Sequence, residues 1–514
     1  MDRRDLMKNM LLSTGMMAFG KAEAEQLAER PKRKSFPLPP RRTDGERMPN
    51  ILWICTDQQR FDTLEGLSND LIHTPNLKKL MQESVTFTNA FVQTPICSPS
   101  RASFLTGRYP HVTGLRANGQ KIRATERLVP RILADYEYTC GLSGKLHLAP
   151  CFGGRVEERI DDGYEIFHWS HDVGDGWPLK NEWHVWLEQK GIKLPKAPEQ
   201  EPWGMPLDPK YTQTAWCAEM AINFMRSQKD FTPWMFSVNI YQPHPPYYPT
   251  QEYLKHYDPA KMPAPAYQEG ELGNKPVFQR IDHEGGYAGT SLSFTKTSAD
   301  AHKQLTAAYY AMIEQVDTEV GRMLRVLEET GQADNTIVIF MSDHGEMLGD
   351  HGIYQKGPYF YDCLTRVPLI IRWPKRFKAG LKVDSLVEMV DLAPTLLDAA
   401  GIPEPVGMQG RSLMPLLTGK TTEHRDSVYM EYLDANAPYQ TPPMLTGVRT
   451  TDWKLTYCND PKSGELYDLV HDPGEFHNLW NSPQHKDVQQ AMLQKLVSRM
   501  IETTDPLPDR HSWW

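Results

Sequence analysis

The stretch NILWICTD, residues 50–57, decides the fold, because it is a short apolar run that ends in a carboxylate. Apolar and β-branched residues without polar alternation are typical of a strand that is buried on both faces of a parallel sheet. The stretch TIVIFMSDHGE, residues 336–346, repeats this design and places Asp343 and His344 after its own strand. Ligands of such sheets bind beyond the carboxyl ends of the strands. We therefore expect Asp57, Asp343 and His344 to meet at one sheet edge.

The chain between these two strands contains segments with a helical period. The clearest are residues 73–85 and 302–331, and the second ends at Gly331, a residue type that favours helix termini. Two further buried strands, bounded by prolines, are predicted within residues 234–247 and 367–374. Strands that alternate with helices predict an α/β fold, in which helices flank a large, doubly wound, mostly parallel sheet.

The sequence changes character after residues 391–401, which form a predicted helix closed by glycine. Short strand-like segments from about residue 436 precede one more predicted helix, and this order indicates a small antiparallel α+β subdomain. We assign residues 48–435 to the large domain and residues 436–514 to the subdomain. Residues 268–300 show neither a helical nor a strand period, and so long a loop is typical of a functional or disordered segment.

The first 24 residues have the layout of an export signal. Paired arginines precede a short apolar run and small residues suited to cleavage, and the order Arg-Arg-x-Leu-x-Lys (residues 3–8) resembles a bacterial twin-arginine signal. An amphipathic helix that is never removed is the alternative. Residues 25–47 are predicted to be a basic, proline-rich linker. We expect a protein exported to the bacterial periplasm or to the cell exterior.

Composition excludes several classes of partner. The chain of 514 residues has a formal net charge of −9, so it offers no basic field for a nucleic acid. No stretch approaches the roughly 20 apolar residues that cross a bilayer, and we expect no stable membrane insertion. The seven cysteines lack the spacing of zinc sites, and their odd number argues against a complete disulfide framework. One of them can therefore have a task of its own.

Aromatic side chains gather within 18 residues of the chain. They are Trp169, His171, Trp177, Trp183 and Trp186. Aromatic faces stack well on sugar rings. Trp183 and Trp186, however, are three positions apart on a predicted helix, and this spacing favours a stripe of core residues.

Several short motifs along the chain contain acidic, basic or thiol side chains. They are ICTDQQ with Asp57 and Gln58, CSPSR with Cys97 and Arg101, LTGR at residues 105–108, GKLH with Lys145 and His147, QPHPP with His244, SDHGE with Asp343 and His344, and QKG with Lys356. Cys-x-Pro-Ser-Arg followed by Leu-Thr-Gly-Arg is a highly specific combination. From about residue 48 to residue 479 the chain resembles the type I sulfatases of the alkaline phosphatase superfamily, and the resemblance implies an alkaline phosphatase-like fold.

The resemblance implies a sulfuric ester hydrolase, which we expect to act on a carbohydrate. In this family a maturation enzyme oxidises the cysteine of the pentapeptide to 3-oxoalanine (formylglycine), and the aldehyde hydrates to a geminal diol. One hydroxyl attacks sulfur, and the resulting hemiacetal sulfate expels sulfate as the aldehyde is regenerated. The implied partners are thus a sulfated small molecule or glycan and a formylglycine-generating enzyme.

The resemblance also implies roles for six catalytic residues. They are Cys97 as the modified nucleophile, Arg101 as the holder of the diol and metal ligands, Lys145 and Lys356 as sulfate ligands, His147 as the group that orients or deprotonates the diol, and His244, with Lys356, as the proton donor to the leaving oxygen. Cleavage of an S–O bond needs positive charge close to the sulfuryl oxygens and protonation of the leaving oxygen.

One divalent cation is implied as a cofactor. Its ligands would be Asp57, Gln58, Asp343, His344 and the hydroxyl derived from Cys97. Such hard ligands suit Ca²⁺, or alternatively Mg²⁺. Many family members carry a second aspartate and an asparagine where this chain has Gln58 and His344, and an imidazole ligand also suits Mn²⁺.

Two other functions remain open. The combination of Asp-Gln with Asp-His is also the pattern of phosphonate monoester hydrolases and related diesterases, which use formylglycine as well. A phosphonate monoester or phosphodiester hydrolase on the same scaffold is therefore an alternative. The other is a non-catalytic binder of sulfated glycans, in which Cys97 is never converted.

Overall fold

The computed structural model describes residues 47–171, 181–196, 202–228, 232–287, 292–433, 439, 442–460 and 462–507. The predicted export signal, nearly all of the predicted linker, Trp177 and the C-terminal residues 508–514 lie outside this part of the chain. All described residues belong to one compact unit. Among them, no helix combines the length and the hydrophobicity that a bilayer-spanning segment requires.

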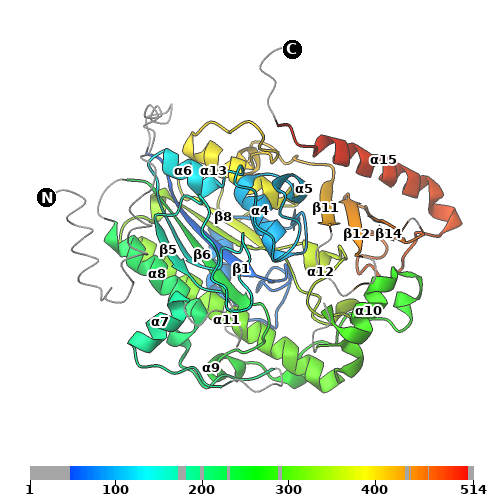
Figure 1. Cartoon of the computed structure of the whole chain (residues 1–514), viewed down its shortest axis with the longest axis horizontal. Helices are drawn as coiled ribbons and strands as arrows, with labels where there is room; N and C mark the ends of the chain where they lie inside the picture. Colours follow the sequence, from blue (N-terminus) through cyan, green and yellow to red (C-terminus); the bar gives the residue numbers. More distant parts are fainter. Residues whose placement is uncertain are drawn as a thin grey trace, which may run out of the picture. The chain divides into compact units, whose positions relative to one another are not determined.

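An eight-stranded sheet forms the centre of this unit (Figure 1). Its strands, in spatial order, are β5 (Ile166–Trp169), β4 (Thr139–Gly144), β6 (Trp234–Pro243), β1 (Asn50–Asp57), β7 (Thr336–Ser342), β8 (Leu369–Arg372), β2 (Val85–Phe87) and β9 (Leu381–Val383). The five strands from β5 to β7 run parallel, β8 is antiparallel to both of its neighbours, and β2 pairs with β9 in parallel. The predicted mostly parallel α/β sheet is confirmed.

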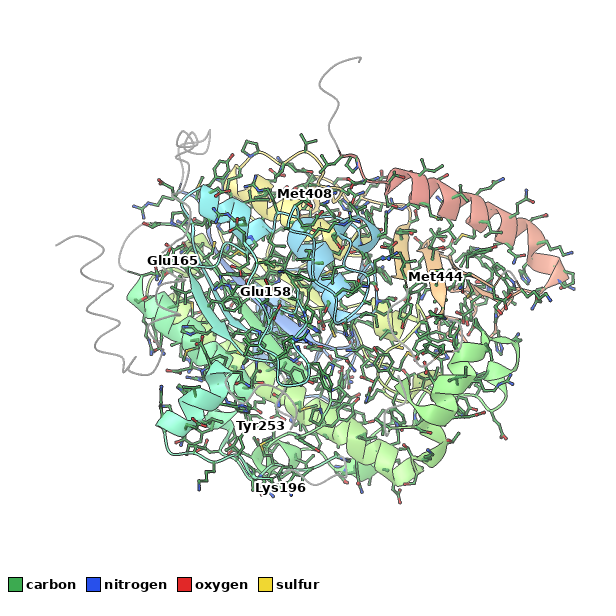
Figure 2. All side chains as sticks on the ribbon, in the orientation of Figure 1. Glu158, Glu165, Lys196, Tyr253, Met408 and Met444 are labelled. Atoms are coloured by element: carbon green, nitrogen blue, oxygen red, sulfur yellow. The ribbon has the colours of Figure 1, made fainter. Side chains whose placement is uncertain are left out.

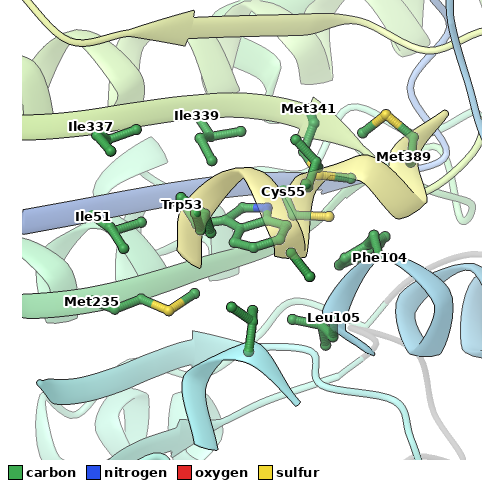
Figure 3. Close-up of a cluster of buried hydrophobic side chains, with 14 of the residues drawn as sticks. Ile51, Trp53, Cys55, Phe104, Leu105, Met235, Ile337, Ile339, Met341 and Met389 are labelled. Carbon is green, nitrogen blue, oxygen red and sulfur yellow. The ribbon is translucent and has the colours of Figure 1, made fainter. Parts of the chain in front are cut away.

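Helices cover both faces of the sheet. One face packs against α4 (Cys97–Thr106), α6 (Val129–Asp135) and α13 (Leu392–Ala400). The other packs against α3 (Pro75–Gln82), α8 (Gln213–Ser227) and α11 (Ala299–Glu329). The side chains of β1 alternate between the two: Figure 3 shows Trp53 and Cys55 beside Phe104 of α4, whereas Leu52 belongs to the opposite core. Burial on both faces is the reason why β1 has no polar alternation.

A second, four-stranded antiparallel sheet lies near the C-terminus. Its strands are β11 (Val428–Leu433), β12 (Met444–Arg449), β13 (Trp453–Cys458) and β14 (Gly464–Asp468). Helix α15 (Lys486–Glu502) packs on it through Met492 and Leu496. The predicted small antiparallel α+β element is present, and its first strand precedes residue 436. The division of the chain into two domains stays a prediction.

Shorter elements connect the layers, and side chains fill the space between them (Figure 2). They are β3 (Ala90–Phe91), α5 (Pro110–Thr113), α7 (Glu182–Gln189), α9 (Gln251–Leu254), α12 (Asp362–Thr365), β10 (Val387–Glu388) and α14 (Met414–Leu417). Trp183 on α7 is buried in the core and Trp186 packs against it, as their spacing predicts. All seven cysteines lie in the described residues, and each is buried as a thiol outside any disulfide bond.

Helix α10 (Val277–Gly285) corrects the prediction that residues 268–300 have no regular structure. Two of its apolar side chains point outward, since Val277 is 64% and Ile281 40% exposed, whereas Phe278 is buried. Two of its three buried side chains are polar. Gln279 donates a hydrogen bond to Glu465 of the second sheet and accepts one from Tyr361, and Asp282 accepts hydrogen bonds from two tyrosine hydroxyls. Because most of its buried face is polar, this helix lacks the continuous apolar stripe from which a helix is predicted.

Asp282 makes the stability of this helix contact dependent on pH. Burial raises the pKa of its carboxyl group to about 7, while the hydroxyls of Tyr439 and Tyr359 act in the opposite direction. The folded protein therefore keeps a proton that the unfolded chain releases above its usual pKa of 3.8, and this contribution to stability is lost as the pH rises from about 4 to 7. We predict that Asp282→Asn gains stability relative to the parent over this range, by on the order of 2–4 kcal/mol.

Melting curves of the two proteins at pH 5 and pH 8 measure this difference. The exposed Asp70→Asn serves as the matched control and should show no such trend. A Tm difference between Asp282→Asn and the parent that is the same at both pH values would contradict the prediction.

Candidate active site

Two carboxylates stand side by side where β1 and β7 end. The strands are parallel neighbours with Thr56 paired to Ser342, so the next residues, Asp57 and Asp343, emerge at the same sheet edge. Both side chains are fully buried. The backbone N–H of Gln58, which has a left-handed φ of 68°, donates to Oδ1 of Asp343 at 3.0 Å. The sheet register thus brings two acids that are distant in sequence into one buried pair.

Arg101 on helix α4 joins the two carboxylates. Its guanidinium group donates from Nε to Oδ2 of Asp343 at 2.8 Å and from Nη2 to Oδ2 of Asp57 at 3.3 Å. Nη1 donates to the carbonyl oxygen of Lys145 at 2.8 Å. The side chain is 1% exposed. Buried carboxylates are costly without paired charge, and one buried guanidinium therefore stabilises three segments at once.

Cys97, the first residue of α4, faces the same cluster. Its Sγ lies 3.7 Å from Oδ1 of Asp57, 3.1 Å from Nε2 of His344 and 2.9 Å from Nζ of Lys356. Burial raises the pKa of the thiol, but Lys145, Lys356 and His344 together hold it well below its usual value. These charged neighbours favour a reactive thiolate at position 97, whereas a cysteine that serves only as a small buried hydrophobe has apolar surroundings.

The residues around the carboxylates fit a divalent cation. Ligand atoms of Asp57, Cys97, Asp343 and His344 all lie within 4.8 Å of one another. Nδ1 of His344 lies 2.8 Å from the carbonyl oxygen of Gly345, so it donates there and leaves Nε2 directed at the cluster. Two carboxylates with an imidazole suit Ca²⁺, Mg²⁺ or Mn²⁺ in their donor chemistry.

Two lysines surround the cluster with positive charge. Lys145 donates from Nζ to Asp57, and Lys356 donates to the side-chain carbonyl of Gln58 at 2.9 Å. Burial acts to lower the pKa of both ammonium groups, yet Asp57 and Cys97 raise it above the usual value. Both lysines are therefore charged at neutral pH, although they are almost completely buried.

Two histidines complete the predicted site. Nε2 of His244 lies 3.1 Å from Nζ of Lys356, and its Nδ1 lies 2.6 Å from the carbonyl oxygen of Pro245. His147 is buried in a left-handed backbone conformation, with φ of 63°. Burial and the charge of Lys145 lower the pKa of His147 to about 4, so its ring is neutral near pH 7. All residues predicted for the site lie in the described chain, and the structure brings them together.

Glu346 is a site residue that the sequence analysis did not single out. Its fully buried carboxylate accepts hydrogen bonds from the side-chain amide of Gln58 and from the backbone N–H groups of Leu348 and Gln355. It therefore orients one predicted metal ligand and fixes the loop that carries Lys356. The only sequence signal was its place in the SDHGE motif, three residues after Asp343.

Comparisons with known proteins agree with this geometry. The family model described as Sulfatase matches residues 49–402, and that described as N-sulphoglucosamine sulphohydrolase, C-terminal, matches residues 349–502. The chain belongs to the sulfatase family, within the alkaline phosphatase superfamily. It is a sulfuric ester hydrolase.

Relatives and solved structures match over most of their length. A choline-sulfatase from Rhizobium meliloti is 32% identical, over 87% of this chain and 85% of its own. An N-acetylglucosamine-6-O-sulfatase from Bacteroides thetaiotaomicron is 27% identical, over 91% and 89%. The crystal structure of the phosphonate monoester hydrolase of Agrobacterium radiobacter has a TM-score of 0.78 at 27% identity, over 90% of this chain and 97% of its own.

The bonds of Glu346 predict a positioning role that can be measured. We expect Glu346→Ala to weaken divalent cation binding by about 10- to 100-fold, because a supporting partner of a ligand is lost. We expect kcat/KM for an aryl sulfate to fall by a similar factor, with Glu346→Gln intermediate. Isothermal titration with the cation and steady-state kinetics measure the two effects.

The matched control is Glu465→Gln, which alters a buried glutamate of β14 away from the site. It should change the Tm without changing cation affinity. Equal cation affinity in Glu346→Ala and the parent protein would contradict the role given to Glu346.

Proposed function

We propose that this sulfatase hydrolyses a sulfate ester of a carbohydrate, with a formylglycine made from Cys97 and one divalent cation. The observation that carries the proposal is the position of Cys97, whose Sγ lies 3.7 Å from a strand-end carboxylate and 2.9 Å from a lysine ammonium group. The carbohydrate part is supported by the match to the N-acetylglucosamine-6-O-sulfatase over nine-tenths of this chain.

The residues around Cys97 can supply what the reaction needs from the protein. A bound cation would supply positive charge, and the hydrated aldehyde would supply the oxygen nucleophile. Ca²⁺ is our first candidate for the cation, and Mg²⁺ or Mn²⁺ are the alternatives. Asp57, Gln58, Asp343 and His344 would hold the cation. Lys145 and Lys356 bind the sulfuryl oxygens and oppose the negative charge that grows on them.

Three side chains handle protons in this proposal. His147 has a neutral ring, so it can accept a proton from the nucleophile. Lys356 donates to Nε2 of His244 across 3.1 Å, and this pair delivers a proton to the leaving oxygen. Tyr241 contacts Nδ1 of His244 through its hydroxyl group and fixes the ring.

Maturation and location belong to the same proposal. A formylglycine-generating enzyme would read residues 97–101, which are the first five residues of α4. The arrangement of residues 1–24 supports export to the bacterial periplasm or the exterior.

A phosphonate monoester or phosphodiester hydrolase is the second candidate. The TM-score of 0.78 to such an enzyme favours it, as do Gln58 and His344 at the cation site. The ratio of kcat/KM for a sulfate monoester and for a phosphate diester separates the two. A ratio in favour of the diester would reverse our assignment.

Replacement of Cys97 tests the nucleophile. We predict that Cys97→Ala reduces sulfate release to the uncatalysed level, whereas Cys140→Ala, which alters a buried cysteine of β4, retains turnover. Both proteins are expressed with a formylglycine-generating enzyme. In the active parent, mass spectrometry of the peptide spanning residue 97 should show a carbonyl oxygen in place of the thiol and one hydrogen. Turnover by a protein whose Cys97 is wholly unmodified would contradict the proposal.

A comparison of substrates with different leaving groups tests the role of His244 in protonating the leaving oxygen. We predict that His244→Gln lowers kcat for a sugar sulfate by about 10²- to 10⁴-fold, because an alkoxide leaves poorly without a proton. Aryl sulfates with acidic phenols should lose far less. The control His256→Gln, which alters an exposed histidine 2.9 Å from Glu314, should leave both unchanged. A loss that is the same for all leaving groups would refute this role.

A further inference from the structure

We propose a second metal site beside the first, formed by His147, Cys151 and His171 and suited to a borderline-soft divalent cation such as Zn²⁺. One ligand atom of each residue lies within 4.8 Å of the other two. All three side chains are buried, with exposed fractions of 6%, 3% and 2%. Zinc with nitrogen and sulfur ligands places these atoms about 3.3–3.6 Å apart, so modest side-chain rotations would close the site.

A buried nitrogen atom points independently to a ligand. Nδ1 of His147 is buried and has no hydrogen-bond partner among the described residues. Such atoms are rare, because an unpaired buried polar group costs free energy. The ring of His171 meets that of His147 edge-on, with centroids 4.8 Å apart. A cation bound by Nδ1 would satisfy the unpaired nitrogen.

Glu157 holds the ligand-bearing segments in place. Its buried carboxylate accepts hydrogen bonds from the backbone N–H of His147 at 2.9 Å and of Leu148 at 2.6 Å. It also accepts one from Nε1 of Trp169 at 2.9 Å, two residues before His171. One anion therefore links the loop that carries His147 to the strand end that precedes His171. This brace preorganises the site and adds negative charge near an incoming cation.

The two sites differ in donor chemistry. The first offers two carboxylates with an imidazole, which suit hard cations, whereas the second offers two imidazoles and a thiolate, which select zinc-like ions. The sites can therefore hold different metals at the same time. A second cation bound at Nδ1 of His147 would leave the ring's proton on Nε2. The ring could then not accept a proton from the nucleophile. Zinc should therefore slow turnover, a consequence that rests on the proposed function, whereas the binding does not.

Cobalt spectroscopy on the full-length chain tests the binding. Cys97→Ala is the background, because it removes the other thiol that lies near metal ligands. We expect Co²⁺ to produce the near-ultraviolet absorption of a thiolate–cobalt bond, and Zn²⁺ to displace it. The absorption should vanish in Cys97→Ala/Cys151→Ala and persist in Cys97→Ala/Cys458→Ala, which alters a buried cysteine of the second sheet.

A second variant guards against misfolding. His171→Ala retains the thiol and should raise the Kd for Zn²⁺ by more than about 100-fold, since even supporting partners of a ligand contribute 10- to 100-fold. Absence of the thiolate absorption in the Cys97→Ala background, or its survival without Cys151, would overturn the site. In the matured parent, zinc should inhibit and Cys151→Ala should relieve the inhibition. Binding without inhibition would overturn the effect on turnover and contradict the role of His147 in the proposed function.

Discussion

The pairing of Arg101 with two adjacent buried carboxylates is the constraint on which the site depends. Asp57 and Asp343 carry like charges at the ends of neighbouring strands, and both are fully buried. Two anions so placed repel each other and lose their hydration, so the fold must supply positive charge next to them. Arg101 contacts both, Lys145 contacts one, and a bound divalent cation would contribute further. The positive groups that would act on a bound substrate are therefore also those that stabilise the fold at this point.

The backbone determines where these charges meet. Helix α4 starts at Cys97, so the residue at its first turn faces the carboxylates while Arg101, one turn later, reaches across them. Negative charge at residue 97 is favoured there both by the lysines and by the amino end of the helix. Glu346 holds the loop after β7 so that Lys356 returns to the same point. Three separate segments are thus fixed around one side chain.

The sequence was sufficient for much of this arrangement. Uninterrupted apolar runs predict buried strands, and carboxylates at the ends of parallel strands share one sheet edge. The positions of Asp57 and Asp343 therefore followed from the sequence pattern alone. The roles of Cys97 and the lysines came from the resemblance to sulfatases. Helix α10 was missed because its buried face carries the polar residues Gln279 and Asp282.

Other features depend on contacts that a sequence does not display. The sequence does not distinguish Glu346 from other glutamates, and its role is visible only from the three hydrogen bonds that its carboxylate accepts. Cys151 lies four residues after His147, but His171 lies 20 residues beyond Cys151, and only the fold places its ring beside the other two side chains. In each case the deciding information is the three-dimensional position of a polar atom within the core.

A crystal structure of the matured enzyme with Mn²⁺, with anomalous diffraction to locate the ion, would show whether both strand-end carboxylates and residue 97 hold the same cation. We predict an anomalous peak within coordination distance of carboxylate oxygens from both Asp57 and Asp343 and of the side chain at position 97. A peak that contacts only one of these carboxylates, or that lies away from residue 97, would contradict this prediction.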